Sequence, residues 1–251
     1  MTLETLASGI FGAVVGSFLN VCIDRIPAGQ SIVSPPSHCP SCQRSLKPYE
    51  MIPLVSYLIL GGRCRTCGER IPLRVLLVEL GTGATFGLIW LRYGWSWETL
   101  LFMLYSSFLI TIGMIDLEHQ RIPNTLSYPA ILIAAAAVPL FHWDSPGRYL
   151  LGAAVGFAVL FALAWVSPGA MGYGDVKLIL FLGLAVGFPQ VLLVLFLAFV
   201  IGGAAAGILL LAGRVSRKDP IAFGPYLALA GLITMLYGTT IIEWWLRRMG
   251  I

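Results

Sequence analysis

The sequence predicts an all-α membrane protein with about eight transmembrane helices. Hydrophobic residues make up 58% of the 251 residues and charged residues only 11%, whereas a soluble domain typically carries about 25% charged residues. The apolar residues gather in long runs, so most of the surface is expected to face a lipid bilayer. The net charge of +4 comes from scattered bases that form no stripe, and we therefore expect no nucleic-acid partner.

Each apolar run predicts one helix. The runs cover residues 6–23, 75–92, 98–115, 126–141, 149–166, 175–188, 190–212 and 223–245. The sixth is short, with only about a dozen residues before the turn at 187–190, too few for ~30 Å of hydrocarbon. Either Asp175 lies below the membrane surface, or this helix is sheltered inside the bundle. The first run has no basic residue before it, which indicates a retained helix rather than a cleaved signal.

The distribution of Lys and Arg predicts the orientation in the membrane. If segment 24–74 is cytoplasmic, most basic residues fall on the inner side, namely Arg25, Arg44, Lys47, Arg63, Arg65, Arg70, Arg74, Arg121, Lys177, Arg214, Arg217 and Lys218. The outer side keeps Arg92, Arg148, Arg247 and Arg248. Both termini are then expected to face outward.

Segment 24–74 is the one substantial polar insertion, and it holds two cysteine pairs. The pairs Cys39–Cys42 and Cys64–Cys67 each enclose two residues. This spacing lets four thiolates converge tetrahedrally on one metal ion. Two disulfides or free thiols are the alternatives, but a reducing cytoplasm favours structural zinc. Four protein ligands leave no open position, so we expect no catalytic role for the metal.

Two acidic residues stand out because ionisable groups at membrane depth usually mark function. Asp116 ends the third apolar run and Asp175 opens the sixth, and both fall on the cytoplasmic side in the predicted orientation. Two carboxylates that share a proton can hold a water and hydrolyse a peptide bond. Capping or a salt bridge with Arg121 is the alternative for Asp116, and N-capping with Lys177 nearby is the alternative for Asp175.

Five further residues are candidates for supporting roles, and one of them is Lys177, which lies two residues after Asp175. Gly172 and Gly174 precede Asp175 and permit close approach of an extended substrate. Asn20 and Glu79 lie in apolar helices near the predicted inner face, where burying polar groups is costly. A hydrogen bond between helices explains Asn20 equally well.

These motifs resemble those of the type IV prepilin leader peptidases, which are also N-methyltransferases. The resemblance covers nearly the whole chain. It is carried by Gly16–Val21 with Arg25–Pro27, the two cysteine pairs, Ile52–Leu58, Gly62–Arg65, Val78–Glu79, Asp116 with His119 and Pro123, Gly172–Lys177, and Phe223–Tyr226. Val75 and Asn124 depart from the family pattern, which has an aromatic residue and commonly an acid there.

The resemblance implies a multi-pass enzyme of the bacterial cytoplasmic (inner) membrane that serves a type IV pilus or type II secretion system. Its substrates would be prepilins or pseudopilins, cleaved after a glycine by the pair Asp116 and Asp175. The new α-amine would then be methylated with S-adenosylmethionine. Glu50 and Arg63 are candidates for that second activity on resemblance alone. An ion or proton-coupled transporter that uses the same carboxylates is the alternative function, and a zinc-stabilised scaffold is a third.

Overall fold

The computed structural model describes residues 2–166, 171–216 and 221–250. Over these ranges the chain is built of helices and contains no strand, only two isolated β-bridges in the polar insertion. It divides into two compact units, Met1–Thr111 and Ile112–Ile251, and α4 (Trp97–His119) passes from the first to the second. Arg217 and Lys218, which the orientation argument used, lie outside the described residues.

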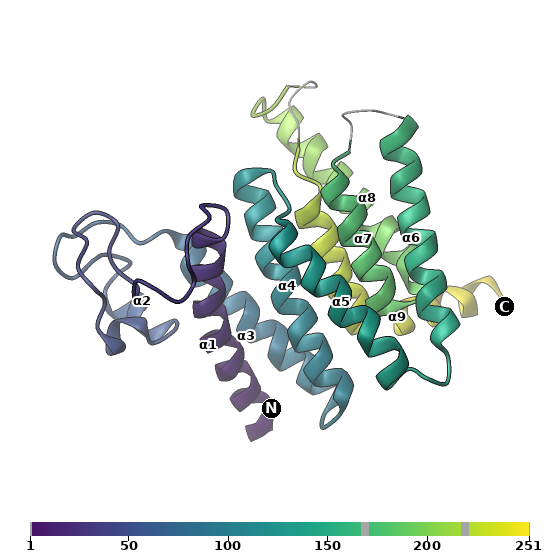
Figure 1. Ribbon diagram of the computed structural model, residues 1–251, viewed down its shortest axis with the longest axis horizontal. Coiled ribbons are helices and arrows are strands. Elements are labelled where there is room, and N and C mark those ends of the chain that lie inside the picture. The colour runs from purple at the N-terminus through teal and green to yellow at the C-terminus, as the bar shows by residue number, and fades with distance from the viewer. Residues whose placement is uncertain (1, 167–170, 217–220, 251) are drawn as a thin grey trace. The chain divides into compact units, whose positions relative to one another are not determined.

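The first unit is organised by the close pairing of two helices, α1 (Leu3–Arg25) and α3 (Leu73–Tyr93), which Figure 1 shows side by side. Glycines on α1 make this possible. A Cβ atom added at Gly12 would lie 2.8 Å from Cβ of Phe86, and one at Gly16 would lie 2.8 Å from Cα of Glu79. Small residues four apart allow such close helix crossings in membranes. The insertion between these helices contains η1 (Pro48–Met51) and α2 (Val55–Ile59), which the sequence did not predict.

The second unit surrounds one short helix. Its helices are α5 (Asn124–Phe141), α6 (Pro146–Val166), α7 (Tyr173–Val186), α8 (Gln190–Leu211) and α9 (Gly224–Met249). The 14-residue α7 packs against all four of the others, and ten of its residues are buried. The short sixth helix is therefore sheltered inside the bundle, as the second explanation expects.

Glycines also set the closest contact within this unit, between α6 and α7. A Cβ at Gly152 would lie 2.6 Å from the carbonyl carbon of Gly187, and one at Gly183 would lie 2.5 Å from the carbonyl oxygen of Gly152. The backbones of the two helices touch near the C-terminal end of α7, and Ile179 packs against Gly156 nearer its start. Because Asp175 lies in the first turn of α7, this packing also restricts where its carboxylate can be.

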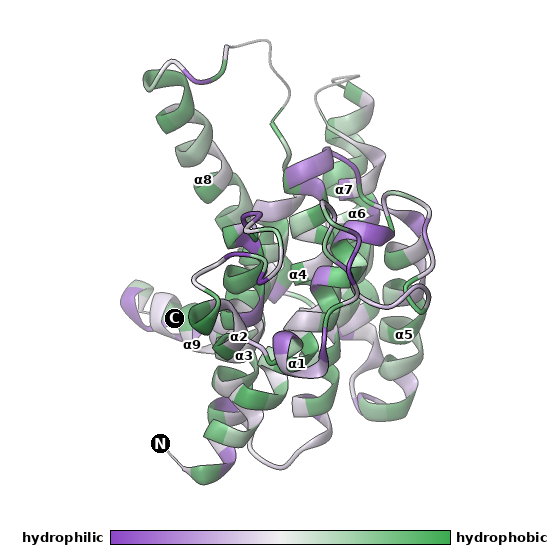
Figure 2. Cartoon of the chain, turned by 90° about the vertical axis from the view of Figure 1, so that its left-hand side faces the viewer, coloured by the Kyte–Doolittle hydropathy of each residue, from purple (hydrophilic) through white to green (hydrophobic). Residues whose placement is uncertain are grey.

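The predicted all-α membrane fold is confirmed. All eight expected helices are present, and seven helices in the described residues are long and apolar enough to cross a membrane. The eighth is the short α7. Figure 2 shows hydrophobic residues along the helices and hydrophilic ones in the insertion. Large apolar side chains point outward from the helices, as Leu132 and Leu211 do with 68% and 89% exposure, which suits lipid rather than water.

Candidate active site and metal centre

Asp116 lies in the last turn of α4 and is buried, with 6% exposure. Its Oδ2 atom accepts a 3.0 Å hydrogen bond from the backbone amide of Gly224, at the start of α9. The first amides of a helix have no partner within that helix and so readily bind anions. The end of α4 and the beginning of α9 therefore meet at this carboxylate. No ion pair joins Asp116 to Arg121 in the described residues, so that alternative is not supported.

Asp175 lies in the first turn of α7 and is also buried, with 7% exposure. Gly172 is the residue that precedes this helix, and its carbonyl accepts the amide of Asp175 at 3.1 Å. The Oδ1 atom of Asp175 is buried and has no hydrogen-bond partner in the described part of the chain. A buried carboxylate oxygen without a donor is costly, which makes it a candidate contact for a water or a substrate.

The structure brings the two acids together. The carboxylate of Asp116 acts electrostatically on Asp175, although 59 positions separate them along the chain. Ile122, in the segment after α4, lies close to the first turns of both α7 and α9. A Cβ at Gly174 would lie 2.8 Å from Cβ of Ile122, and one at Gly224 would lie 3.2 Å from its Cδ1. The two glycines thus let Ile122 pack against the residue that precedes Asp175 and against the residue that donates to Asp116.

Lys177 does not pair with either acid. Its Nζ atom donates a hydrogen bond to Oδ1 of Asn124 and lies 5.2 Å from the ring centroid of Tyr128, both on α5. The residue that departs from the family pattern, Asn124, is thus the direct partner of Lys177. These contacts tie the first turn of α7 to the first turns of α5 and support the position of Asp175.

The four cysteines of the insertion converge, as the sequence predicted. The Sγ atoms of Cys39, Cys42, Cys64 and Cys67 all lie within 4.8 Å of one another, and none is in a disulfide. The two loops have the same form. The amide of the first cysteine bonds to the carbonyl five residues later, Arg44 at 3.0 Å or Glu69 at 2.7 Å. The residue after the second cysteine, Gln43 or Gly68, has positive φ.

This donor set fits a tetrahedral ion that prefers sulfur ligands. Four thiolates from two equivalent loops are the arrangement of structural zinc sites. A bound zinc would hold the two loops together, which the insertion needs because so few of its apolar residues are buried. With four protein ligands in place, the metal would have no open position for a substrate.

Asn20 and Glu79 lie in the first unit and are both buried, with 6% and 4% exposure. The Nδ2 atom of Asn20 donates to the carbonyls of Gly16 at 3.2 Å and Val75 at 3.1 Å. The second of these is the helix-to-helix bond that the sequence offered as an alternative. Oε2 of Glu79 accepts the amide of Leu54 at 2.7 Å.

The remaining candidates from the insertion differ in their surroundings. Glu50 is buried and accepts two hydrogen bonds from the guanidinium of Arg44, each 2.9 Å long. Arg44, together with the amide of Lys47, lowers the pKa of Glu50 to about 2. Arg63 is exposed and pairs through its backbone with Arg70. A structural role accounts for both.

Sequence reasoning on individual residues missed Gly224 and Ile122. Gly224 belongs to the Phe223–Tyr226 stretch that carried part of the resemblance, and the Pro that follows it marks a helix start. That signal could have pointed to an available amide. Nothing in the local sequence of Ile122 distinguishes it from an ordinary apolar residue.

Comparison with known proteins decides the family. The Bacterial Peptidase A24 N-terminal domain matches residues 10–93, and the type IV leader peptidase family matches residues 103–207. The chain belongs to the type IV leader peptidase family. The family recognition made from the sequence is thus confirmed, and so is the class of enzyme, a peptidase that is also a methyltransferase.

Several relatives of this leader peptidase family are called prepilin leader peptidase/N-methyltransferase. The protein of Bacillus subtilis is 34% identical over 95% of this chain and 96% of its own length. That of Pseudomonas aeruginosa is 33% identical over 98% and 94%. That of Myxococcus xanthus is 40% identical over 80% of this chain and 62% of its own length. No solved structure matches the chain.

Proposed function

We propose that this leader peptidase removes the leader from type IV prepilins or pseudopilins with Asp116 and Asp175 as its catalytic pair. The observation that carries the proposal is the meeting of two buried carboxylates, from the end of α4 and the start of α7, within one compact unit. Neither acid is neutralised by a basic side chain in the described residues. Such a pair has little use in holding a fold together, because burying two unpaired acids side by side is unfavourable.

The chemistry follows from one proton shared between two carboxyl groups. The ionised partner removes a proton from a water, whose oxygen attacks the carbonyl carbon of the scissile bond. The neutral partner gives its proton to the carbonyl oxygen. When the tetrahedral intermediate collapses, the carbon–nitrogen bond breaks and the leaving amine takes the proton that the first carboxylate had removed from the water. The second carboxylate takes back a proton from a hydroxyl of the intermediate, so the pair returns to its starting state. The unpartnered Oδ1 of Asp175 suits the task of holding the water.

The glycines around the pair support an extended substrate. Gly172 is exposed and precedes α7 without a side chain, so a peptide strand could approach Asp175 closely. We propose cleavage after a glycine of the substrate, at the cytoplasmic membrane face. With the insertion 24–74 cytoplasmic and both termini outward, most basic residues would lie inside, as membrane proteins prefer. The lipid bilayer would hold the apolar substrate helix, and the basic leader would stay at the inner surface.

We further propose that the enzyme methylates the new N-terminal amine. S-adenosylmethionine would supply an electrophilic methyl group when bound. Zinc on the four cysteines would keep the insertion folded without taking part in either reaction. Both activities would serve a type IV pilus or a type II secretion system.

One experiment tests the cleavage proposal. The purified enzyme, its Asp116→Asn and Asp175→Asn variants, and a Glu118→Gln control are incubated with a prepilin in lipid vesicles, and the products are weighed by mass spectrometry. Glu118 is an exposed acid two residues beyond Asp116. We expect each Asn variant to cleave at least about 10²-fold more slowly, and the control to behave like the wild type. Normal cleavage by both Asn variants would refute the proposed pair.

A further inference from the structure

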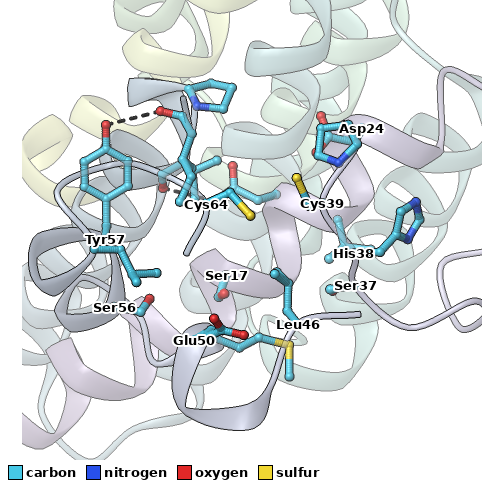
Figure 3. A pocket seen from close by; sticks show the side chains of 18 of the residues that line it. Ser17, Asp24, Ser37, His38, Cys39, Leu46, Glu50, Ser56, Tyr57 and Cys64 are labelled. Atoms are coloured by element: carbon cyan, nitrogen blue, oxygen red, sulfur yellow. Dashed lines mark hydrogen bonds between the residues drawn. The ribbon is translucent and has the colours of Figure 1, made fainter. Parts of the chain in front are cut away.

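The short helix α2 of the insertion has two faces with different surroundings. Ser56 and Tyr57 face inward and line a cavity of about 530 Å³ between the insertion and the helices α1 and α3, as Figure 3 shows. The hydroxyl of Tyr57 donates a 3.4 Å hydrogen bond to the carbonyl of Ile71. These contacts hold α2 on the insertion and leave its other face directed outward.

The outward face of α2 is apolar. Leu58 and Ile59 are 69% and 79% exposed, and neither is among the residues that line the cavity. Ile52 and Val55 are exposed as well. Large apolar side chains gathered on one exposed segment mark a surface that contacts a membrane or another protein.

The hydrogen bond between Leu54 and Glu79 sets the level of α2 along the membrane helices. Leu54 directly precedes α2, and its amide donates to Oε2 of Glu79 at 2.7 Å. On α3, Glu79 lies five residues beyond Arg74, which is about 8 Å further along the helix axis. Arg74 pairs with Asp24, and such charges belong at the headgroup level rather than in hydrocarbon. The start of α2 therefore lies beside the membrane helices, on the hydrocarbon side of that ion pair.

Two further observations agree with this level. Figure 1 shows α2 at the height of the middle of α1, rather than beyond the end from which the insertion leaves. On α3, Leu77 and Leu80 stand on either side of Glu79 in the sequence, and both are exposed. The apolar face of α2 thus continues the lipid-facing surface of the helices next to it.

The rest of the surface of the insertion is basic. Lys47 and Arg65 gather at the ring of Tyr49, with Nζ and Cζ 5.9 Å and 5.8 Å from its centroid. Of the acids between α1 and α3, Glu50 is buried, which leaves Glu69. The exposed bases are Lys47, Arg63, Arg65 and Arg70. Apolar side chains together with Lys and Arg are typical of surfaces that bind anionic bilayers.

We propose that α2 is a membrane anchor. Leu58 and Ile59 insert into the bilayer leaflet on the side of the insertion, and the exposed bases lie among the phosphate groups of anionic lipids. In the proposed orientation this is the cytoplasmic leaflet, which carries such lipids. The anchor gives the insertion a third attachment to the membrane besides α1 and α3. The inference goes beyond cleavage and methylation and depends on neither.

Lipid cross-linking tests the anchor directly. The purified enzyme is placed in vesicles of phosphatidylglycerol and phosphatidylcholine that contain a phospholipid with a diazirine in its acyl chain. After illumination, mass spectrometry locates the labelled residues. We expect label on Leu58 and Ile59, as on the exposed Leu77 of α3, because all three contact acyl chains.

The matched control inside the insertion is Val33. It is apolar and 85% exposed, like the outward face of α2. Its neighbour Ser31 accepts a 2.9 Å hydrogen bond from the guanidinium of Arg25 in the last turn of α1, so this segment stays at the end of that helix. We expect at least about tenfold less label on Val33 than on α2.

Variants show which side chains hold the anchor in the bilayer. Leu58→Ser combined with Ile59→Ser should lower the label on α2 at least about tenfold, because the apolar area that favours insertion is lost. Val33→Ser should leave it unchanged. In detergent, both proteins should keep the wild-type protease half-life of residues 24–74, which excludes unfolding as the cause. If the double variant fails this check, the lipid dependence of the wild type decides: in phosphatidylcholine alone, the label on α2 should fall several-fold.

Absence of label on wild-type α2, while Leu77 is labelled, would overturn the inference. Label on Val33 equal to that on α2, or full label on a folded double variant, would do the same. Cross-links from α2 to a second copy of the chain would assign this face to self-association instead. Equal label in neutral and anionic vesicles would refute the part given to the bases. The proposed function fails separately, if the wild type leaves a prepilin uncleaved.

Discussion

The backbone amide of Gly224 donates a 3.0 Å hydrogen bond to Oδ2 of Asp116, and the same glycine leaves no space for a side chain there. A Cβ at this position would lie 2.6 Å from that oxygen. The first turn of α9 thus both binds and confines a proposed catalytic carboxylate. An interaction with backbone cannot be replaced by another side chain, so this position tolerates little change.

We expect Gly224→Ala to impair cleavage strongly while the protein still inserts and folds. The added methyl group would push Asp116 away from its amide partner, and a misplacement of about 1 Å can cost about 10²-fold in rate. The measurement is the rate of leader removal from a prepilin. Gly203→Ala on α8 is the matched control, because a Cβ there meets nothing within 4 Å. Equal rates for both variants would show that the contact is unimportant.

Removing one ligand of the cysteine cluster should destabilise the insertion and leave cleavage intact. In Cys64→Ser we expect loss of bound zinc and rapid proteolysis of residues 24–74, because the two loops are no longer joined. Cleavage should persist, because Asp116 and Asp175 both lie in the second unit. Zinc content, protease half-life and both product masses report these effects. Cys22→Ala serves as the control, as Cys22 lies in α1 outside the cluster. Unchanged zinc content in Cys64→Ser would contradict the assignment of that ligand.

The ion pair between Arg44 and Glu50 should stabilise the insertion. Glu50→Gln leaves the guanidinium with a poorer partner, so we expect a several-fold shorter protease half-life of residues 24–74. Because Arg44 holds the pKa of Glu50 at about 2, below its ordinary 4.5, the pair contributes fully above that ordinary value. The difference from the wild type should therefore be constant between about pH 6 and 8. A difference that disappears within this interval would point to another titrating group.

The contact between Lys177 and Asn124 should help to position Asp175 and should take no part in the cleavage reaction itself. Asn124→Asp keeps an acceptor for the ammonium group, so cleavage should stay within about twofold of the wild type. Lys177→Met removes the donor and should lower the cleavage rate, because α7 loses this polar contact with α5 close to Asp175. The cleavage rates of the two variants, measured under the same conditions, test whether Lys177→Met is the slower one. A larger loss in Asn124→Asp than in Lys177→Met would show that the neutral amide itself is required.

The helices could be predicted from the sequence because each is a continuous apolar run with polar ends. The boundaries of α5 and α8 agree with the expected ones to within two residues. The convergence of the four cysteines was also predictable, since two residues between paired cysteines permit few other arrangements. Composition and residue spacing can be read directly from the sequence, and the helices and the cysteine cluster depend mainly on these two properties.

Other features depend on contacts between distant segments and could not be predicted. The sequence selected Asp116 and Asp175, yet their proximity follows from the packing of α7 among its neighbours. The link from Leu54 to Glu79 requires a positive φ at a residue whose side chain disfavours it. Local propensity argues against that conformation, and only the tertiary structure supplies the reason for it.

The ion pair of Asp24 and Arg74 joins the last turn of α1 to the first turn of α3, at the two points where the polypeptide leaves for the insertion and returns from it. The end of α1 and the start of α3 thus lie side by side, and the ion pair that joins them uses no residue between 24 and 74. A tight linker could bridge that gap, and the helical pair would remain as it is. The four-cysteine segment is in this sense a detachable module, which a chain could gain, exchange or discard in one event while the helices α1 and α3 stay paired.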